Sequence, residues 1–232
     1  AGGVGGYVGG RLAAAGADVH LLARGEHLAA LRADGLRVES IHGDVSVDLP
    51  ATDDPADVGR CDAVLFCVKS FDTDAAAARL DPLLDDDTAV ISLQNGVDNE
   101  EKLADAIGRE HVVGGVAYIF STIAEPGVIE HTGGPARIVF GELDGTRSER
   151  VERFLEWCER ADGLEGVLSE DIWGELWEKY AFICAQAGAT AAIGLPIGEI
   201  REVEESWALF RDLLFEVADV AAAEGVDVPD DA

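Results

Sequence analysis

The sequence predicts an α/β fold: a doubly wound parallel sheet of the Rossmann type, with an antiparallel hairpin at its edge, followed by an all-helical second domain. Three observations support this prediction. Apolar strands alternate with helices from residue 1 to residue 117, which is typical of βαβ units. Glycine and proline divide residues 121–141 into short strands. Finally, no strand-like run follows Val167.

The first part of the chain opens with a glycine turn and a helix of small residues over 1–16. The apolar run 62–68 is typical of a parallel strand buried on both faces. Apolar patterning predicts further strands over 19–23, 36–39, 45–49, 89–93 and 112–117, and helices over 26–34, 73–84 and 99–107. This order of elements is that of a parallel sheet with crossover helices.

Residues 128–131 and 137–140 are separated by two glycines and a proline, and we expect them to pair as the antiparallel hairpin at the sheet edge. A helix over 148–160 follows. Further on, apolar residues recur at helical spacing. We therefore expect a first domain over 1–167 and a helical domain over 168–232. Both ends are expected to be incomplete, with the first strand of the sheet missing and the helical domain cut short.

The composition excludes several classes of protein. A balance of 17 basic against 46 acidic residues gives a net charge of −29, so nucleic-acid binding, which needs basic patches, is not expected. No run is long enough to span a membrane and no secretory signal is visible. The four cysteines and five histidines show no metal-ligand or catalytic spacing. We expect a cytoplasmic protein with reduced cysteines, from a salt-accumulating, halophilic source where dense salt screens its charge.

The opening glycines are the first candidate site. Gly2, Gly3, Val4 and Gly5 lie at the start of the first helix, where backbone N–H groups and the helix dipole favour an anion such as a pyrophosphate. Glycine leaves room for a phosphate to approach the backbone. A tight turn with no ligand is the structural alternative, because a glycine cluster alone is a weak signal.

Arg24 follows the second predicted strand, 22 residues after Gly2. An acidic residue at this place would bind the ribose 2′-hydroxyl of NAD, whereas a basic residue suits the 2′-phosphate of NADP. The sequence therefore favours NADP, although Arg24 could also be an ordinary surface arginine.

Two further polar residues follow buried strands. Lys69 ends the run 62–68, and Asn95 lies in the turn after the strand 89–93. The carboxyl ends of parallel strands are where open α/β sheets bind ligands. Because the chain has only three lysines, we favour a ligand-binding role for Lys69 over the alternative that it is a solvated surface charge. Asn95 could also be simply a turn residue before a glycine.

Lys179 lies in the first predicted helix of the second domain, beside Leu176 at the edge of an apolar stripe. Helical periodicity puts Ile183 and Gln186 on the same face. An ammonium group there could hydrogen-bond a carbonyl oxygen and protonate it during hydride addition. The alternative is a snorkelling lysine with an exposed head. His131 is the one histidine that merits inspection, and a structural role is expected for it.

Taken together, these positions resemble the ketopantoate reductase (2-dehydropantoate 2-reductase) family. Seven segments carry the resemblance in the family's order: residues 1–7, 22–24, 67–70, 94–96, 126–131, 176–179 and 194–200. The resemblance implies an N-terminal NADP-binding Rossmann domain, a helical substrate and dimerisation domain that forms a homodimer, and reduction of a branched 2-oxo acid on the route to pantothenate and coenzyme A. It implies that Lys179 is the catalytic acid and that Lys69 and Asn95 line the cofactor and substrate cleft.

The sequence departs from the family at two positions near Lys179. Well-studied members have asparagines where this chain has Ile183 and Ala187, with Gln186 as a polar neighbour that could compensate. The three residues are expected to line the substrate site. The departure leaves two alternatives open: a sibling reductase of another 2-oxo acid or an opine-type substrate, and a catalytically silent NADP-binding regulatory protein.

Overall fold

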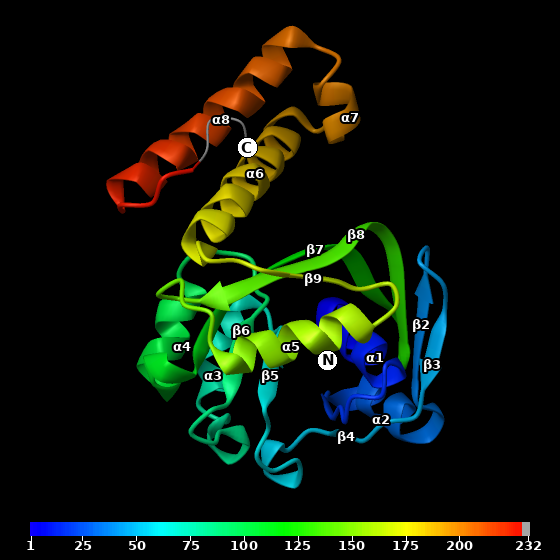
Figure 1. The fold of residues 1–232 in the computed structure, drawn as a ribbon. Helices are drawn as coiled ribbons and strands as arrows, with labels where there is room; N and C mark the ends of the chain where they lie inside the picture. The colour runs from blue at the N-terminus through cyan, green and yellow to red at the C-terminus, as the bar shows by residue number, and fades with distance from the viewer. Residues whose placement is uncertain (229–232) are drawn as a thin grey trace. The chain divides into compact units, whose positions relative to one another are not determined.

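The computed structural model describes residues 1–228, and the acidic tail over 229–232 lies outside them (Figure 1). The chain divides into two compact units. The first comprises Ala1–Gln94 and Asp98–Ile172, and the second comprises Asn95–Val97 and the chain from Trp173 onward. A mixed α/β unit followed by a helical one is the expected fold class. The domain boundary expected near residue 167 stays a prediction.

A sheet of parallel and antiparallel strands forms the centre of the first unit. Its strand order is β3-β2-β8-β7-β6-β5, with β9 on the free side of part of β8, while β1 and β4 pair separately. The neighbours β5–β6, β6–β7, β2–β8 and β8–β9 are parallel. The strands are β1 (Leu21–Leu22), β2 (Leu36–Ser40), β3 (Val45–Val47), β4 (Ala51–Thr52), β5 (Ala63–Phe66), β6 (Ala89–Ser92), β7 (Val112–Glu125), β8 (Val128–Glu142) and β9 (Glu165–Leu168).

Helices cover both faces of this sheet, as its sequence pattern predicts. Successive residues of β6 enter different cores: Ile91 packs with residues of α1 (Gly3–Ala14) and α5 (Glu149–Arg160), and Val90 packs with α3 (Thr73–Ala77) and α4 (Asn99–Ile107). This follows because side chains alternate across a strand. A strand buried on both faces is predominantly apolar, as the predicted strand 89–93 is apart from Ser92. The run 62–68, which was expected to be buried on both faces, instead forms the edge strand β5, where Ala63, Val64 and Leu65 are only half-buried. Helix α2 (Gly25–Asp34) completes the first core.

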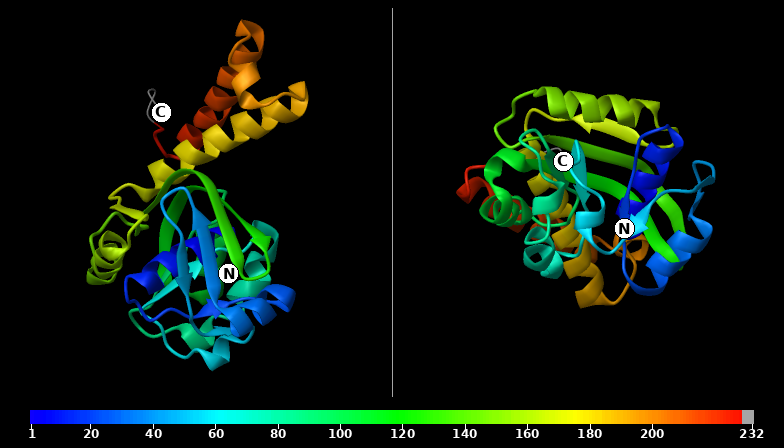
Figure 2. Two further views of the ribbon diagram at one scale, coloured as in Figure 1. Left: turned by 90° about the vertical axis from the view of Figure 1, so that its right-hand side faces the viewer. Right: turned by 90° about the horizontal axis from the view of Figure 1, so that it is seen from below.

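The expected antiparallel hairpin is present, but its strands and its place in the sheet were predicted wrongly. Residues 128–131 and 137–140 belong to one long strand, β8, which pairs antiparallel with β7. The turn is therefore at Pro126 and Gly127. Gly133, Gly134 and Pro135 lie within β8, beside shifts in the β7–β8 register, and both strands are long and bent (Figure 2). Since β2 and β9 also pair with β8, this strand is interior, not at the edge.

Two local features differ from the sequence-based elements. The helix expected over 73–84 ends as α3 at Ala77, and a short 3₁₀ helix follows over Asp81–Leu83. Pro82 prevents the α-helix from continuing, because it has no N–H to donate to the carbonyl four residues earlier, and proline is accepted at the start of the following 3₁₀ helix. Strand β9 was not predicted: its four residues include two that are not strand formers, and parallel pairing with β8 holds them extended. Figure 2 shows α5 running alongside β9.

A buried ion pair joins the end of β8 to the start of α5. Glu142 and Arg150 meet through two hydrogen bonds of 2.7 Å, from Nε to Oε1 and from Nη2 to Oε2, and each side chain is only 10% exposed. Arg150 also donates to the Glu110 carbonyl at 2.6 Å, and the Ser148 hydroxyl donates to Glu142 at 2.5 Å. The pair therefore has every feature that lets a buried salt bridge offset its desolvation.

The second unit is built from α6 (Ile172–Ile193), α7 (Ile197–Ile200) and α8 (Glu204–Ala223). Ala185 and Ala189 of α6 pack in one core with Ile200 and Phe210. The ring of Trp207 stacks on that of Phe210, with their centroids 4.7 Å apart. Small alanines allow close helix approach, while the aromatic pair supplies the buried area. This confirms the all-helical character predicted for the region.

Candidate active site

The glycine turn begins α1 as expected. Gly2 is the N-cap of the helix, and no side chain caps this end. A Cβ atom at Gly2 would meet nothing within 4 Å, so the space beside the first turn is open. At Gly3, by contrast, a Cβ atom would collide with the Ser121 carbonyl, and at Gly5 it would lie 3.3 Å from the Cβ of Cys67. Glycine is therefore needed at Gly3 for packing, while Gly2 leaves the helix N-terminus accessible to an anion.

Arg24 lies at the N-cap of α2, directly after β1, and its side chain is 79% exposed. Its Nη2 is 3.6 Å from the Asp72 carboxylate, in the short 3₁₀ helix Ser70–Asp72 that follows β5. Gly5 approaches Cys67 from the same end of β5. The structure thus brings the glycine turn, Arg24 and the segment after β5 to one edge of the first unit.

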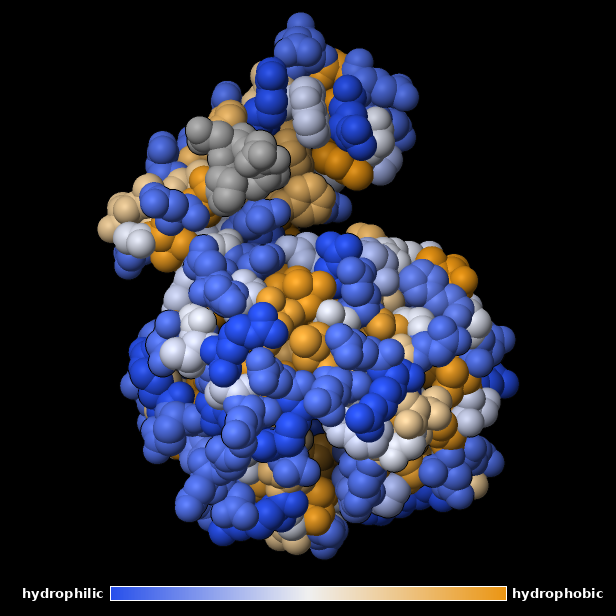
Figure 3. Space-filling model, viewed as in Figure 1, coloured by the Kyte–Doolittle hydropathy of each residue, from blue (hydrophilic) through white to orange (hydrophobic). Residues whose placement is uncertain are grey.

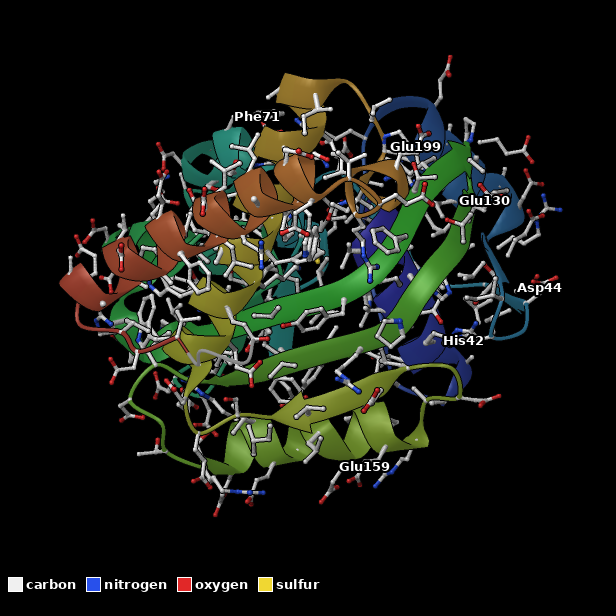
Figure 4. All side chains as sticks on the ribbon, turned by 90° about the horizontal axis from the view of Figure 1, so that it is seen from above. His42, Asp44, Phe71, Glu130, Glu159 and Glu199 are labelled. Carbon is white, nitrogen blue, oxygen red and sulfur yellow. The ribbon has the colours of Figure 1, made fainter. Side chains whose placement is uncertain are left out.

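Lys69 is the N-cap of the 3₁₀ helix Ser70–Asp72, and it is exposed. Phe71, two residues later, is 85% exposed and projects from the same turn (Figure 4). An exposed cation, an exposed aromatic ring and a helix N-terminus at one strand end are suited to a nucleotide, which carries phosphates and a flat base.

Gln94 holds the Lys69 turn in place, a role that the sequence analysis missed. Its Nε2 donates to the Val68 carbonyl at 3.0 Å and to the Thr73 hydroxyl at 2.8 Å. These bonds tie the end of β6 to both sides of the turn after β5. The only sequence signal was an amide following a buried strand, and that pattern does not reveal which carbonyl the amide will meet.

Lys179 and its predicted neighbours lie on α6 of the second unit. At 100° per residue, Ile183 and Gln186 fall within one face with Lys179, and Ala187 lies at its border. This face flanks the Ala185 and Ala189 stripe, which lies about 100° around the helix from it and packs in the core of the second unit. Burial lowers the pKa of the Lys179 ammonium group from 10.5 to about 8. The predicted site residue Asn95 groups with the same compact unit.

His131 has the structural role expected of it. The ring is buried in β8, and its Nε2 lies 2.8 Å from the Gly133 carbonyl. A carbonyl only accepts, so Nε2 carries the proton and Nδ1 accepts from the Ser40 hydroxyl at 2.9 Å. Burial lowers the pKa of the ring. His42 packs edge-on against it at the β2–β3 turn, where His42 and Asp44 lie together (Figure 4).

The structure also bears on metal binding and on membrane insertion. Within residues 1–228, no group of three or more His, Cys, Asp or Glu side chains is placed to hold a metal ion. None of the helices in this range combines the length and apolar character needed to cross a bilayer. On the face shown in Figure 3, hydrophilic residues predominate, with scattered hydrophobic patches between them.

Comparison with known proteins identifies the family. The family described as "Ketopantoate reductase PanE/ApbA" matches residues 1–145, and its C-terminal family matches residues 171–232. The chain is 35% identical to an oxidoreductase, YkpB, of Bacillus subtilis (97% of this chain, 74% of the relative). It is 34% identical to a 2-dehydropantoate 2-reductase of Pyrococcus horikoshii (98% and 71%).

The fold agrees with these matches. The crystal structure of a 2-dehydropantoate 2-reductase from Porphyromonas gingivalis superimposes with a TM-score of 0.91 at 34% identity, covering 99% of this chain and 82% of that one. Family matches over both units and a shared fold along nearly the whole chain lead to one conclusion. The chain belongs to the ketopantoate reductase family, whose members are nicotinamide-dependent oxidoreductases acting on a CH–OH group.

Proposed function

We propose that this protein catalyses the NADPH-dependent reduction of a 2-oxo acid, and that the acid is 2-dehydropantoate, which gives pantoate for pantothenate and coenzyme A biosynthesis. The observation that carries the proposal is the convergence of the open glycine turn, Arg24 and the Lys69 turn at one edge of the first unit. The naming of several relatives as 2-dehydropantoate 2-reductases supports the choice of substrate.

The residues at this edge fit a dinucleotide phosphate. Gly2, Gly3, Val4 and Gly5 supply the uncapped helix N-terminus and the open space that a pyrophosphate needs. Arg24 is exposed and can exchange its Asp72 partner for the 2′-phosphate of NADP. When bound, the nicotinamide ring would supply the hydride.

Lys179 acts as the general acid in this proposal. A pKa near 8 keeps most of the side chain protonated at neutral pH while making its proton easier to release than that of a solvated lysine. The ammonium group would hydrogen-bond the substrate carbonyl and protonate the developing alkoxide. Asn95 would donate its amide to the substrate or cofactor, and Lys69 would place a second positive charge near the bound anions.

The face of α6 around Lys179 favours a second candidate substrate. Ile183 and Ala187 offer no hydrogen bonds where relatives were expected to have asparagine, and Gln186 is the polar group nearby. A sibling reductase acting on a more apolar 2-oxo acid, or on an opine-type substrate, would suit this face. The third reading, a silent NADP-binding protein, would give Lys179 no chemical role.

Consumption of NADPH measured at 340 nm decides among these readings. We expect turnover with 2-dehydropantoate to exceed that with a panel of straight-chain, branched and aromatic 2-oxo acids, and NADPH to be preferred over NADH. Faster turnover of another panel acid would identify the sibling reductase. No turnover with any acid, alongside normal NADPH binding, would support the silent protein.

Two broader expectations belong to the same proposal: the protein works in the cytoplasm, and it forms a homodimer through its helical domain. Exposed apolar side chains on α6 and α8, namely Phe182, Phe215 and Val220, support the second. Sedimentation velocity should show a dimer. Substitution of Phe215 by Glu should shift it toward the monomer without altering the fold of the first unit.

A further inference from the structure

A buried polar cluster lies at the carboxyl end of β6, beneath the turn that the Lys69 segment makes. Its members come from α3, from β6 and the residues just after it, and from α4, and they are at most 6% exposed: Thr73, Ser92, Gln94, Asn99 and Glu100. In sequence, they flank Asn95–Val97 on both sides. Polar side chains at these positions are unexpected in a core, since burial of polar groups is favourable only when they are hydrogen-bonded.

Glu100 is the most unusual member. It is in the first turn of α4 and wholly buried. Within the described part of the chain, neither carboxyl oxygen makes a hydrogen bond of good geometry, although its own backbone N–H and the Ser92 hydroxyl lie near enough to act on it. The Ser92 hydroxyl and the Gln94 amide oxygen, also buried, are in the same state. The Ser92 hydroxyl can donate or accept a hydrogen bond, whereas the Gln94 amide oxygen can only accept. An ionised carboxylate would add two more oxygens that only accept, with the Ser92 hydroxyl as the one side-chain donor among these three groups. A carboxylic acid carries an O–H that can donate to one of them.

The electrostatic surroundings of Glu100 agree with a neutral acid. Burial is the largest influence and raises its pKa from 4.5 to about 7, and Asp98 and Glu101 raise it further. Its own backbone N–H and the Ser92 hydroxyl act in the opposite direction but do not outweigh burial.

Within residues 1–228, the lysine and the arginine nearest to this carboxyl group in sequence are paired with other carboxylates. Lys102 is ion-paired with Asp98, and Arg109 is ion-paired with Glu101. The elements packed against α4 are α3, β7 and the 3₁₀ helix Arg109–His111. Their remaining titratable or charged groups near α4 are Asp74, Glu110 and His111.

We propose that Glu100 is a positioning residue: as a neutral acid it joins Ser92 at the end of β6 to the first turn of α4, and so fixes the segment that carries Asn95. The inference rests on the proposed function, because Asn95 is there a ligand of cofactor and substrate. Loss of the proton would bury an uncompensated charge next to Ser92, two residues before Gln94, whose hydrogen bonds to Val68 and Thr73 hold the Lys69 turn. Ionisation of Glu100 therefore loosens two segments of the cofactor edge together, and weakens binding more than chemistry.

The substitution Glu100→Gln tests this, because glutamine keeps the shape and the donor of the neutral acid but cannot ionise. Glu101→Gln is the matched control, since Glu101 is adjacent, exposed and paired with Arg109. Glu100→Ala removes the donor altogether. The melting temperature and the NADPH Kd, followed by nicotinamide fluorescence, are measured at pH values below and above 7, and kcat and KM are measured beside them.

We expect the wild type and Glu101→Gln to lose several-fold in NADPH affinity as pH rises through 7, while Glu100→Gln does not. The melting temperature of Glu100→Gln relative to wild type should be higher above pH 7 than at pH 5 by about 5 °C. Glu100→Ala should raise KM and Kd at every pH with a smaller change in kcat. The titration of Lys179 affects wild type and variants alike, so it cancels when the Kd, KM and kcat of each variant are divided by the wild-type values at the same pH.

Parallel melting curves of wild type and Glu100→Gln at all pH values would overturn the neutral acid. A difference in melting with no difference in NADPH affinity or KM would make Glu100 purely structural and overturn its positioning role. The absence of turnover with every 2-oxo acid, alongside the expected contrast in melting and NADPH affinity, would refute the proposed function alone and support the role of Glu100.

Discussion

Replacing Lys179 by methionine should stabilise the protein at neutral pH while it removes the general acid. Burial lowers the Lys179 pKa from 10.5 to about 8, so the folded state disfavours the charged form. At 1.36 kcal/mol per pKa step the full difference is about 3 kcal/mol. The Lys179 side chain is partly exposed, and the methionine variant lacks the polar contacts of the ammonium group. We therefore expect a smaller gain, about 1–2 kcal/mol in unfolding free energy at pH 7.

The direction in which this stability difference changes with pH follows from the Lys179 pKa values in the folded and unfolded states. Below pH 8 the lysine is charged in both the folded and unfolded states, and the burial penalty is complete. Between pH 8 and 10.5 the folded state has lost the proton and the unfolded state retains it, so wild-type stability rises with pH. The advantage of the methionine variant should therefore be largest at pH 7 and decline toward pH 10.

Urea unfolding of wild type and Lys179→Met at pH 7 and pH 10, with turnover measured on the same samples, provides the assay. Lys102→Met is the matched control: its ammonium group is exposed in an i,i+4 pair with Asp98, so neither stability nor turnover should change appreciably. Turnover of Lys179→Met should fall by about 10² or more. A variant less stable than wild type at pH 7, or equally active, would refute the reasoning.

Three further predictions concern cofactor choice, the buried ion pair and salt. Arg24→Ala should raise KM for NADPH by roughly 10-fold or more and leave KM for NADH unchanged, since a charge-assisted hydrogen bond is worth about 1.5–3 kcal/mol. Steady-state kinetics with both cofactors measures this, and an equal change in the two KM values would contradict the prediction. Arg150→Met leaves the buried Glu142 carboxylate without its ion-pair partner and should lower the unfolding free energy, measured by urea unfolding, by about 3–5 kcal/mol. A change below about 1 kcal/mol would show that the pair is dispensable. Raising KCl from about 0.1 M to about 1 M shortens the Debye length from about 10 Å to about 3 Å. Because the net charge is −29, this screening should raise the melting temperature. A melting temperature that does not change with salt would argue against a halophilic protein.

The sequence was most informative where one physical rule dominates. Strand β6, buried on both faces, is apolar except at Ser92, and helical spacing identifies α6 and α8. The rule that ligands bind at the carboxyl ends of parallel strands predicts the position of Lys69 after β5. Arg24 follows β1, which pairs with β4 outside the main sheet, and its ion pair with Asp72 brings it beside the Lys69 turn. These two residues and the glycine turn come together as expected.

The sequence failed where long-range pairing overrides local signals. Gly133, Gly134 and Pro135 would mark a turn in isolation, yet pairing with β7 on one side, and with β2 and β9 on the other, carries β8 past them. The polar cluster around Glu100 was missed for a related reason. A glutamate in the first turn of a helix is ordinarily a solvated residue, and only the tertiary structure shows that it is buried.

The central claim is that Lys179 protonates a 2-oxo acid as NADPH reduces it, and the pH profile of kcat/KM for the reduction tests it most directly. Because kcat/KM reports ionisation in the free enzyme, we predict that a decline of about tenfold per pH unit begins near the Lys179 pKa of about 8. Any several-fold change through pH 7 that comes from Glu100 should be absent when the same profile is measured in Glu100→Gln. Lys179→Ala should lose this descending limb together with most of its activity. A wild-type profile with no decline through pH 9, or a Lys179→Ala variant that keeps both the limb and the rate, would contradict the assignment.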